Sequence, residues 1–273
     1  MSTTRWSGGW LCRSRSAARR TASMWSSLRR AAAGALAALA GLSAATAGAA
    51  DCKGTLRLTL DTGSMIAAER IAGILKARSI RATFFIAAEP TYDGGTPLDA
   101  RWTGYWKARV AEGHAFGSHT VNHWYLREDR PDGILYRSAE GRSRVLDRAA
   151  FCHELADVGD RFRTMTGRGF DPIWRAPGGR TTRNSLDWAP GCGFAQHVGW
   201  SKAGFLGDEL PSDRHPNAEL LRKALANIRD GDILMMHLGI RSRKEPFVDV
   251  LEPLLDGLTA RGFCFATMMD RTG

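Results

Sequence analysis

From residue 55 onward, short apolar runs alternate with longer segments whose apolar residues recur at helical spacing. The predicted strands are Thr55–Leu60, Ala82–Ala87, His114–Gly117, a run ending at Ile173–Arg175, Phe194–Val198, Ile233–Met236 and Phe263–Thr267. The predicted helices are Met65–Ala77, Trp102–Ala111, Arg142–Thr164, Ser185–Trp188, Ala218–Ile228 and Phe247–Ala260. Strand–helix alternation at this spacing favours right-handed crossovers and a parallel sheet. About seven such units predict an α/β fold, a single distorted (β/α)7-type barrel with parallel strands.

The first fifty residues differ in character from the rest of the chain. They contain seven Arg and no Asp or Glu, and they end in a short Ala/Leu/Gly run and small residues. A basic start, a short apolar centre and an Ala-x-Ala exit are typical of a secretory signal rather than a spanning helix. We expect residues 1–50 to be a leader that is cleaved near Ala49 or Ala50, after translation from the first methionine or from Met24. Residues 51–273 would then form one exported, periplasmic or extracellular domain without a stable membrane span.

The positive charge of the chain belongs largely to that leader. The sequence has 38 basic and 28 acidic side chains, and removing the leader's seven Arg leaves 31 basic side chains. A nucleic-acid-binding domain needs a basic face on its folded part. The nearly balanced charge of residues 51–273 therefore argues against a nucleic-acid partner.

The exported part retains four cysteines, Cys52, Cys152, Cys192 and Cys264. An even number in an oxidising compartment permits two disulfides with three possible connectivities. Cys52 opens the first predicted strand and Cys264 lies in the last, so a barrel that closes first strand to last would bring them near. Free buried thiols are the alternative, and none of the four has the spacing of a zinc ribbon.

Four short polar motifs stand where apolar runs end: Thr59–Gly63, His119–His123, Arg175–Gly179 and Leu234–His237. Side chains at the carboxyl ends of parallel strands converge on one mouth, where α/β enzymes do their chemistry. The motifs supply one carboxylate, two histidines at metal-binding spacing, an arginine and a late histidine. That combination suits metal-assisted hydrolysis.

The histidine pair is the candidate metal site. His119 and His123 are four residues apart, which on a helical turn places both imidazoles on one face. Neutral imidazole is a good ligand for zinc and similar divalent ions. The pattern also arises by chance, but Gly117 and Ser118 place this pair at a strand exit.

The other motif residues have both catalytic and ordinary explanations. Asp61 ends the first strand and is either a catalytic base or a helix cap, although Ser64 could cap the next helix instead. Arg175 could orient Asp61 and hold it ionised, or form an ordinary salt bridge. His237 beside two methionines could be packing, but it too stands at a strand end.

Taken in order, these motifs make the chain resemble the polysaccharide deacetylases of the NodB-homology type, carbohydrate esterase family 4. The resemblance covers about Leu56 to Met268, and the family pattern has a T-F-D-D-type first motif, then H-[ST]-x-x-H, R-x-P, an Asp/Trp motif and L-x-H. The matching residues are Thr59–Gly63 except at its second acid, His119–His123, Arg175–Pro177, Trp200 and His237.

The resemblance implies a hydrolase that removes acetyl groups from an N-acetylated or O-acetylated polysaccharide. It implies Asp61 as general base, His119 and His123 as ligands of a divalent metal, expected to be zinc, Arg175 as the residue that orients Asp61, and His237 as general acid. The partner is then an acetylated polysaccharide or oligosaccharide.

Three further residues are candidates for substrate contact. Trp124 follows the histidine pair and Trp200 lies near the mouth, so both could stack on sugar rings. The backbone N–H of Gly178 could stabilise the oxyanion. Core packing is the alternative for the tryptophans, and we prefer it for Trp106 and Trp188.

Two positions depart from the family pattern. The second acid of the first motif, the expected third metal ligand, is Thr62, whose hydroxyl is a poor ligand for zinc. The acid expected before Trp200 is Gly199, which leaves His237 without its usual charged partner. Either Asp61 moves onto the metal, another acid such as Asp93 or Asp99 substitutes, or the site holds metal weakly.

These departures leave two rival functions. A glycan-binding domain without hydrolytic activity could retain this fold and tolerate both changes. Asp61-Thr62-Gly63-Ser64 also matches the signature of an aspartic protease, but that mechanism needs two such carboxylates. The chain has one such motif, and the α/β pattern argues against an all-β protease.

Overall fold

The computed structural model describes residues 52–271, so the predicted leader lies outside the described residues. The strands are β1 (Gly54–Asp61), β2 (Thr83–Ile86), β3 (Ala115–Ser118), β4 (Tyr125–Arg130), β5 (Gly133–Arg137), β6 (Ser143–Leu146), β7 (Ile173–Trp174), β8 (Gln196–His197), β9 (Ile233–His237) and β10 (Phe263–Phe265). The α-helices are α1 (Ala68–Ala77), α2 (Thr103–Ala111), α3 (Arg148–Thr166), α4 (Arg183–Trp188), α5 (Asn217–Asn227) and α6 (Leu251–Ala260). Short 3-10 turns are η1 (Ala100–Trp102), η2 (Pro177–Gly179), η3 (Ala189–Cys192) and η4 (Phe247–Val250). Among these residues no helix is long and apolar enough to cross a bilayer.

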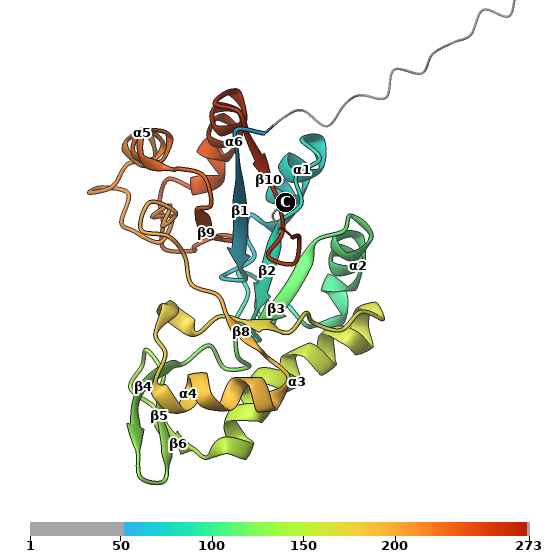
Figure 1. Ribbon diagram of the computed structural model, residues 1–273, viewed down its shortest axis with the longest axis vertical. Helices are drawn as coiled ribbons and strands as arrows, with labels where there is room; N and C mark the ends of the chain where they lie inside the picture. Colours follow the sequence, from blue (N-terminus) through green and yellow to red (C-terminus); the bar gives the residue numbers. More distant parts are fainter. Residues whose placement is uncertain (1–51, 272–273) are drawn as a thin grey trace, which may run out of the picture. The chain divides into compact units, whose positions relative to one another are not determined.

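The main sheet is parallel and curls into a distorted barrel (Figure 1). Its strands run in the order β9, β1, β2, β3, β7, β8, and β10 adds to the amino-terminal half of β1. After β8 the chain turns back along β9, where Phe205 forms a single parallel bridge with Met235. The predicted distorted barrel of parallel strands is confirmed.

Apolar stripes on the helices explain why they cover this sheet. In α1 the residues Ala68, Ile71, Ala72 and Leu75 are buried, which is the spacing of one helical face. The leucines of α6 repeat the same pattern. Together with the buried strand residues these faces form the larger apolar core.

The prediction missed an antiparallel sheet formed by β4, β5 and β6, and part of that sheet was wrongly assigned to a helix. The predicted helix Arg142–Thr164 begins too early, because Ser143–Leu146 is β6 and α3 starts at Arg148. Asp147 fixes that start: its side chain accepts a hydrogen bond of 2.7 Å from the Ala150 N–H. The new sheet packs on α3 and on β7 through a second apolar core.

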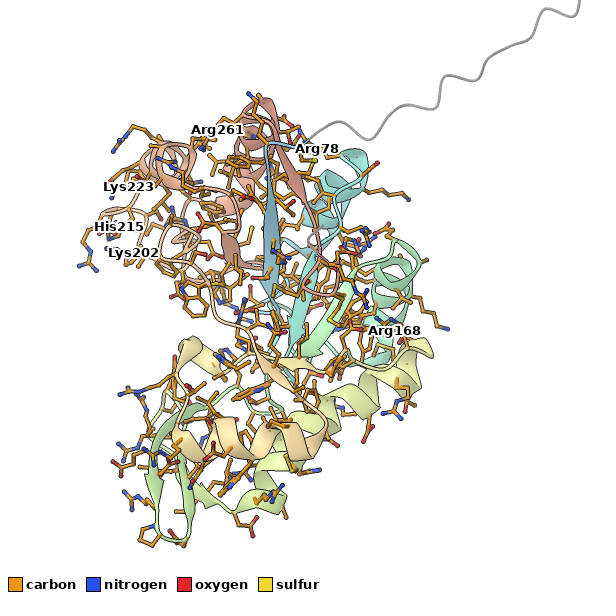
Figure 2. All side chains as sticks on the ribbon, viewed as in Figure 1. Arg78, Arg168, Lys202, His215, Lys223 and Arg261 are labelled. Atoms are coloured by element: carbon orange, nitrogen blue, oxygen red, sulfur yellow. A yellow bond between two sulfur atoms is a disulfide. The ribbon has the colours of Figure 1, made fainter. Side chains whose placement is uncertain are left out.

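Two arginines tie the outer helices together at the end of the barrel where β1 begins. Arg78 at the end of α1 donates to Asp256 of α6 at 2.7 and 2.8 Å. Arg261 at the end of α6 donates to the carbonyl oxygens of Leu225 in α5 and of Ile228 directly after it, at 2.6 and 2.8 Å. Both arginines are labelled near the amino end of β1 (Figure 2). These links therefore lie away from Asp61, at the other end of the strand.

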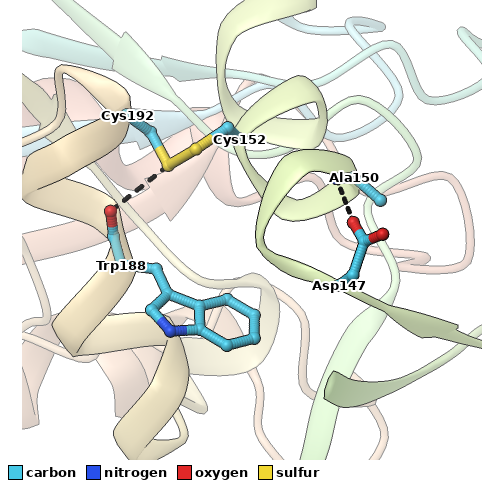
Figure 3. The surroundings of a disulfide bond; sticks show 5 residues. All are labelled: Asp147, Ala150, Cys152, Trp188 and Cys192. Carbon is cyan, nitrogen blue, oxygen red and sulfur yellow. Dashed lines mark hydrogen bonds between the residues drawn. A yellow bond between two sulfur atoms is a disulfide. The ribbon is translucent and has the colours of Figure 1, made fainter. Parts of the chain in front are cut away.

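Two disulfides are present among the described residues. Cys52 pairs with Cys264 at a Cα–Cα distance of 5.6 Å, which joins the first strand to the last as the barrel prediction required. Cys152 pairs with Cys192 at 5.0 Å and ties α3 to the segment after α4. Cys192 Sγ also lies 3.3 Å from the Trp188 carbonyl oxygen (Figure 3). The second disulfide thus fixes α4 and η3 to the helix that supports the antiparallel sheet.

Removing the Cys152–Cys192 disulfide is expected to destabilise the protein without displacing the barrel. A closed loop of 40 residues nominally contributes about 3–4 kcal/mol to the free energy of unfolding. At about 2–4 °C per kcal/mol for a domain of this size, Cys152→Ser/Cys192→Ser should lower Tm by about 6–16 °C. Thermal unfolding followed by circular dichroism, with and without reductant, measures this. A reduced wild-type protein that unfolds at the oxidised Tm would contradict it.

Candidate active site

A buried ion pair between Asp61 and Arg175 occupies the carboxyl end of the barrel. Asp61 is the last residue of β1 and Arg175 follows β7; their exposed fractions are 3% and 0%. Arg175 Nη1 donates to Asp61 Oδ1 at 2.8 Å. Its Nε and Nη2 donate to the carbonyl oxygens of Val198 and Gly199, each at 2.9 Å. Each of the three guanidinium nitrogens therefore donates a hydrogen bond. The fold brings the motif of Asp61 and the motif of Arg175 together, as expected.

The ion pair sets the charge of Asp61. Burial opposes ionisation of this carboxyl, but the positive charge of Arg175, with smaller contributions from His119 and His237, holds the pKa of Asp61 below its usual value. Asp61 is consequently an ionised, desolvated carboxylate at neutral pH. A carboxylate in that state is suited to accept a proton.

Replacing Arg175 with methionine leaves the Asp61 charge buried without its partner. We expect Arg175→Met to lower the free energy of unfolding by about 3–5 kcal/mol. The loss should be greatest at neutral pH and smaller in acid, because burial without Arg175 raises the pKa of Asp61 in the variant, and protonation then removes the unpaired buried charge as pH falls. Urea unfolding at pH 7 and pH 4 measures both values. Arg78→Met is the control: it removes two ion pairs, to the exposed carboxylates of Glu252 and Asp256, each worth about 0–1 kcal/mol. An equal loss in both variants would refute the assignment.

The two histidines meet beside this pair, but not on a helical turn. Their ring centroids are 4.7 Å apart. The segment from His119 to His123 is an irregular loop in which Thr120 and His123 adopt left-handed backbone angles, with φ of 65° and 53°. The expectation of a shared helical face was therefore wrong, although the rings still converge.

Side chains from the unpredicted sheet and from α3 hold this loop in shape. Tyr136 Oη of β5 lies 3.0 Å from Thr120 Oγ1, accepts from the Trp124 N–H at 3.1 Å and donates to Glu154 Oε2 at 3.1 Å. Glu154 in turn accepts from the Asn122 N–H at 3.1 Å. The antiparallel sheet thus supplies the support that a helical turn would otherwise provide.

The hydrogen bonds of His119 show which of its nitrogens faces the site. Its Nδ1 lies 2.9 Å from the carbonyl oxygen of Arg175, which can only accept, so Nδ1 carries the proton. Burial lowers the pKa of His119 to about 4, although the charge of Asp61 opposes that shift, so the ring is neutral. Nε2 therefore presents a lone pair, and it lies 3.5 Å from Asp61 Oδ2. Two acceptors that face each other in this way leave a place for a cation or a water molecule.

A carboxylate that sequence reasoning did not single out lies beside the second histidine. Glu89 follows β2, and its Oε2 is 3.5 Å from His123 Nδ1. Its Oε1 accepts hydrogen bonds from Thr62 Oγ1 at 2.8 Å and from the Gly63 N–H at 2.9 Å. The sequence pattern could have identified Glu89, because it is an acid close to the end of a buried strand, as is Asp61.

The donor types gathered here suit a divalent metal. Two imidazoles with the carboxylates of Asp61 and Glu89 are the ligands that zinc takes in hydrolases. Within residues 52–271, no three His, Cys, Asp or Glu side chains already surround one ion position, so binding requires side-chain adjustment.

Asp93 and Asp99, the two acids considered as replacements for the missing metal ligand, form other contacts. Asp93 pairs with Arg101 at 2.6 Å. Asp99 accepts from the Thr96 N–H and hydroxyl at 2.8 and 3.0 Å. Both carboxylates therefore serve the loop between β2 and α2.

His237 has an acidic partner at a position that the family pattern did not indicate. It ends β9 in register with Asp61, and its Nδ1 lies 3.2 Å from Asp208 Oδ2, which also accepts from the His237 N–H at 2.7 Å. Burial lowers the pKa of His237, but the charge and hydrogen bond of Asp208, with Asp61 and Glu209, outweigh it and raise the pKa to about 10. His237 is therefore protonated at neutral pH and can donate a proton. Nothing in the local sequence pairs it with a residue 29 positions away.

The predicted substrate contacts lie around the same mouth. Trp200 is half-buried, stands over the Arg175 guanidinium at 5.5 Å and over Gly179. Gly178 is exposed with φ of 63°, and a Cβ there would come within 3.0 Å of Tyr125. Trp124 is half-buried and packs on Tyr136 with ring centroids 5.4 Å apart. The guanidinium groups of Arg142 and Arg144 also lie over its ring, at 5.0 and 5.6 Å, so Trp124 belongs to the second core and its surroundings.

A cavity of about 260 Å³ opens beside His237. Asp208 and His237 form part of its wall, and the remainder combines apolar residues with three arginines, Arg70, Arg241 and Arg243. Its other lining residues include Ile66, Ile71, Met236 and Phe247. The proton donor thus stands between the buried ion pair and a space large enough for a small group.

Comparison with known proteins shows the family and the fold of the chain. The profile of the family described as polysaccharide deacetylase matches residues 48–197. No curated protein sequence matches the chain. Many solved structures share its fold, and three of them illustrate the range of relatives. A family 4 acetyl xylan esterase from Clostridium thermocellum, in complex with a cobalt ion, superposes with a TM-score of 0.60 at 17% identity, over 78% of this chain and 88% of that one.

The second is a peptidoglycan N-acetylglucosamine deacetylase, with a TM-score of 0.60 at 21% identity over 78% of this chain and 86% of that one. The third is a pseudoenzyme of carbohydrate esterase family 4 from Bacillus anthracis, with a TM-score of 0.58 at 18% identity over 79% of this chain and 64% of that one. Since the family profile spans more than half of the sequence and the barrel is shared, the chain belongs to the polysaccharide deacetylase family.

Proposed function

We propose that this protein is a metal-dependent hydrolase that removes acetyl groups from a polysaccharide or oligosaccharide. One observation carries the proposal: a carboxylate kept ionised by Arg175 lies in register with a histidine kept protonated by Asp208. Environments that push the pKa values of two neighbouring groups apart are typical of a base and an acid in one site. The family membership and fold agree with this reaction.

Each side chain has a defined part in the hydrolysis. A divalent cation, expected to be zinc and held by His119 and His123, would polarise the acetyl carbonyl and acidify water. Asp61 Oδ2 accepts a proton from the water molecule as its oxygen bonds to the carbonyl carbon. The Gly178 N–H stabilises the negative oxygen that results.

Breakdown of the intermediate completes the reaction. His237 donates its proton to the sugar nitrogen or oxygen as the bond to the carbonyl carbon breaks, and acetate is released. Asp208 keeps His237 charged and turned towards the mouth. Trp200 provides an apolar ring on which a sugar can stack, whereas Trp124 is covered by Tyr136 and by the guanidinium groups of Arg142 and Arg144.

The proposed export fits the same picture. A leader of residues 1–50, cleaved near Ala49 or Ala50, would deliver residues 51–273 to the periplasm or the outside of the cell. Disulfides form and persist in such oxidising compartments, and two of them are present. Polymeric acetylated glycans are also found outside the membrane.

Thr62 supports one rival, a glycan-binding domain that does not hydrolyse. The likeness to a solved pseudoenzyme shows that this fold exists without activity. Against it stand Arg175 and Asp208, which hold Asp61 and His237 in charge states that binding a neutral sugar does not require.

Acetate release decides between these functions. The purified protein should release acetate from N-acetylglucosamine oligomers or acetylated xylan, and chelation should abolish the activity. Asp61→Asn should abolish it, and His237→Gln should lower kcat by about 10²–10⁴-fold, the usual contribution of a positioned proton transfer. Asp93→Asn is the control and should be fully active. Glycan binding without acetate release from any of these substrates would favour the rival.

The pH dependence tests the acid directly. Because the pKa of His237 is raised to about 10, the histidine stays protonated through neutral pH, and activity should fall only as pH approaches that value. Asp208→Asn removes the charge that raises this pKa, so the alkaline limb of kcat/KM should move towards neutral pH. Glu209→Gln, which removes a more distant and more exposed charge, should shift it less. An unmoved alkaline limb in Asp208→Asn would exclude His237 as the acid.

A further inference from the structure

Thr62, which replaces the second acid of the first motif, is hydrogen-bonded to a different carboxylate. Thr62 stands where the family pattern has a metal-binding aspartate, yet its hydroxyl is not turned to solvent. It accepts a hydrogen bond from the Ala87 N–H at 3.2 Å and donates to Glu89 at 2.8 Å. Thr62 therefore holds a carboxylate in place instead of supplying one.

The two oxygens of that carboxylate have different surroundings. Glu89 Oε1 is fixed by two donors, the Thr62 hydroxyl and the Gly63 N–H. Oε2 accepts no hydrogen bond within the described residues and points to His123 Nδ1, 3.5 Å away. One oxygen thus anchors the side chain at the carboxyl end of β1, and the other remains available on the side of the histidines.

The distance of 3.5 Å between Glu89 Oε2 and His123 Nδ1 suits two ligands of one ion better than a direct hydrogen bond. It exceeds the usual N–H···O distance of about 2.7–3.2 Å, so this contact is not a well-formed hydrogen bond. Two ligands bound to one tetrahedral zinc, each about 2.0–2.2 Å from it, lie about 3.3–3.6 Å apart. Glu89 Oε2 and His123 Nδ1 are therefore spaced like neighbouring ligands of one ion.

The exposure of the three side chains agrees with such a site. His119 is buried, with 1% of its side chain exposed, whereas Glu89 and His123 expose 15% and 26%. A cation between them would be enclosed on the side of His119 and reachable from the mouth on the other side. A catalytic metal needs such an open position for water and substrate.

We propose that Glu89 is the carboxylate ligand of the metal site and that Thr62 positions it through a hydrogen bond. Because no three such groups within residues 52–271 already surround one ion position, the side chains move slightly on binding to complete a set of two histidines and one glutamate. This assignment rests on the proposed function for its purpose, since the metal serves that reaction. In the family pattern the carboxylate ligand stands at the carboxyl end of β1, at the position of Thr62. In this chain it is supplied by Glu89, from the segment after β2. Zinc hydrolases use this donor set, two imidazoles and one glutamate, in other folds.

Metal binding tests the assignment independently of activity. The protein is stripped with a chelator and dialysed. Zn²⁺ affinity is then measured by calorimetry, and the visible spectrum of added Co²⁺ reports on coordination. Glu89→Gln keeps a carbonyl oxygen that can accept from Thr62 and Gly63 but removes the charge, and it should weaken Zn²⁺ binding by more than about 100-fold. Thr62→Ala should weaken it by about 10–100-fold, the usual effect of losing a group that orients a ligand.

A rescue and a control make the test specific. Thr62→Asp/Glu89→Gln restores the carboxylate of the family pattern and should recover Zn²⁺ affinity and the Co²⁺ spectrum. Asp93→Asn removes an acid of the same loop that binds Arg101 and should change neither. If Glu89→Gln alone does not fold, the double variant still decides, because it lacks Glu89 and must bind metal through Asp at position 62.

The outcomes separate this assignment from the proposed function. Unchanged Zn²⁺ affinity and an unchanged Co²⁺ spectrum in Glu89→Gln would overturn it, whatever the acetate assay gives. A double variant that stays as weak as Glu89→Gln would overturn it as well. Metal binding that depends on Glu89 in a protein that releases no acetate would support the ligand assignment and reject the hydrolase.

Discussion

The site depends on one buried interaction, the pairing of Asp61 with Arg175. Removing both charges from water carries a large desolvation penalty, which is offset here because each of the three guanidinium nitrogens donates a hydrogen bond. Two of its three acceptors are backbone carbonyls of the segment after β8, and the Arg175 carbonyl oxygen in turn orients His119. The position of the arginine therefore controls the charge of Asp61, the path of the chain towards Trp200 and the nitrogen that His119 presents.

The same principle explains how the site tolerates two departures from the family pattern. A carboxylate is needed at a given point in space, and the residue number that supplies it is secondary. Asp208 reaches His237 from the loop that closes the barrel, and Glu89 reaches His123 from the end of β2. Thr62 and Gly199 are thus compatible with an intact arrangement of charges. The sequence motifs alone identify neither Asp208 nor Glu89, the two acids that stand beside these histidines.

The sequence predicted the parts of the structure that follow from local periodicity. Buried parallel strands and the polar residues at their ends are recognisable, which is why Asp61, Arg175 and His237 were placed at one mouth. The antiparallel sheet was missed because its strands are short and rich in charge; four of the six residues of Tyr125–Arg130 are charged. Asp208 was missed for a different reason: its pairing is purely tertiary, and no spacing rule joins a loop acid to a strand-end histidine.

Few backbone contacts close the barrel between β9 and the segment after β8, and this affects the proton donor. Where β1 and β9 share five residue pairs, the segment after β8 joins β9 by one bridge at Phe205 and a few backbone hydrogen bonds. Local opening requires the least free energy where the fewest such bonds must break. Asp208 lies three residues beyond Phe205. A fluctuation that breaks the contacts between this segment and β9 therefore also moves the negative charge of Asp208 away from His237. The ionisation of the acid is thereby tied to whether the barrel is closed, because opening removes the largest of the charges that raise the pKa of His237.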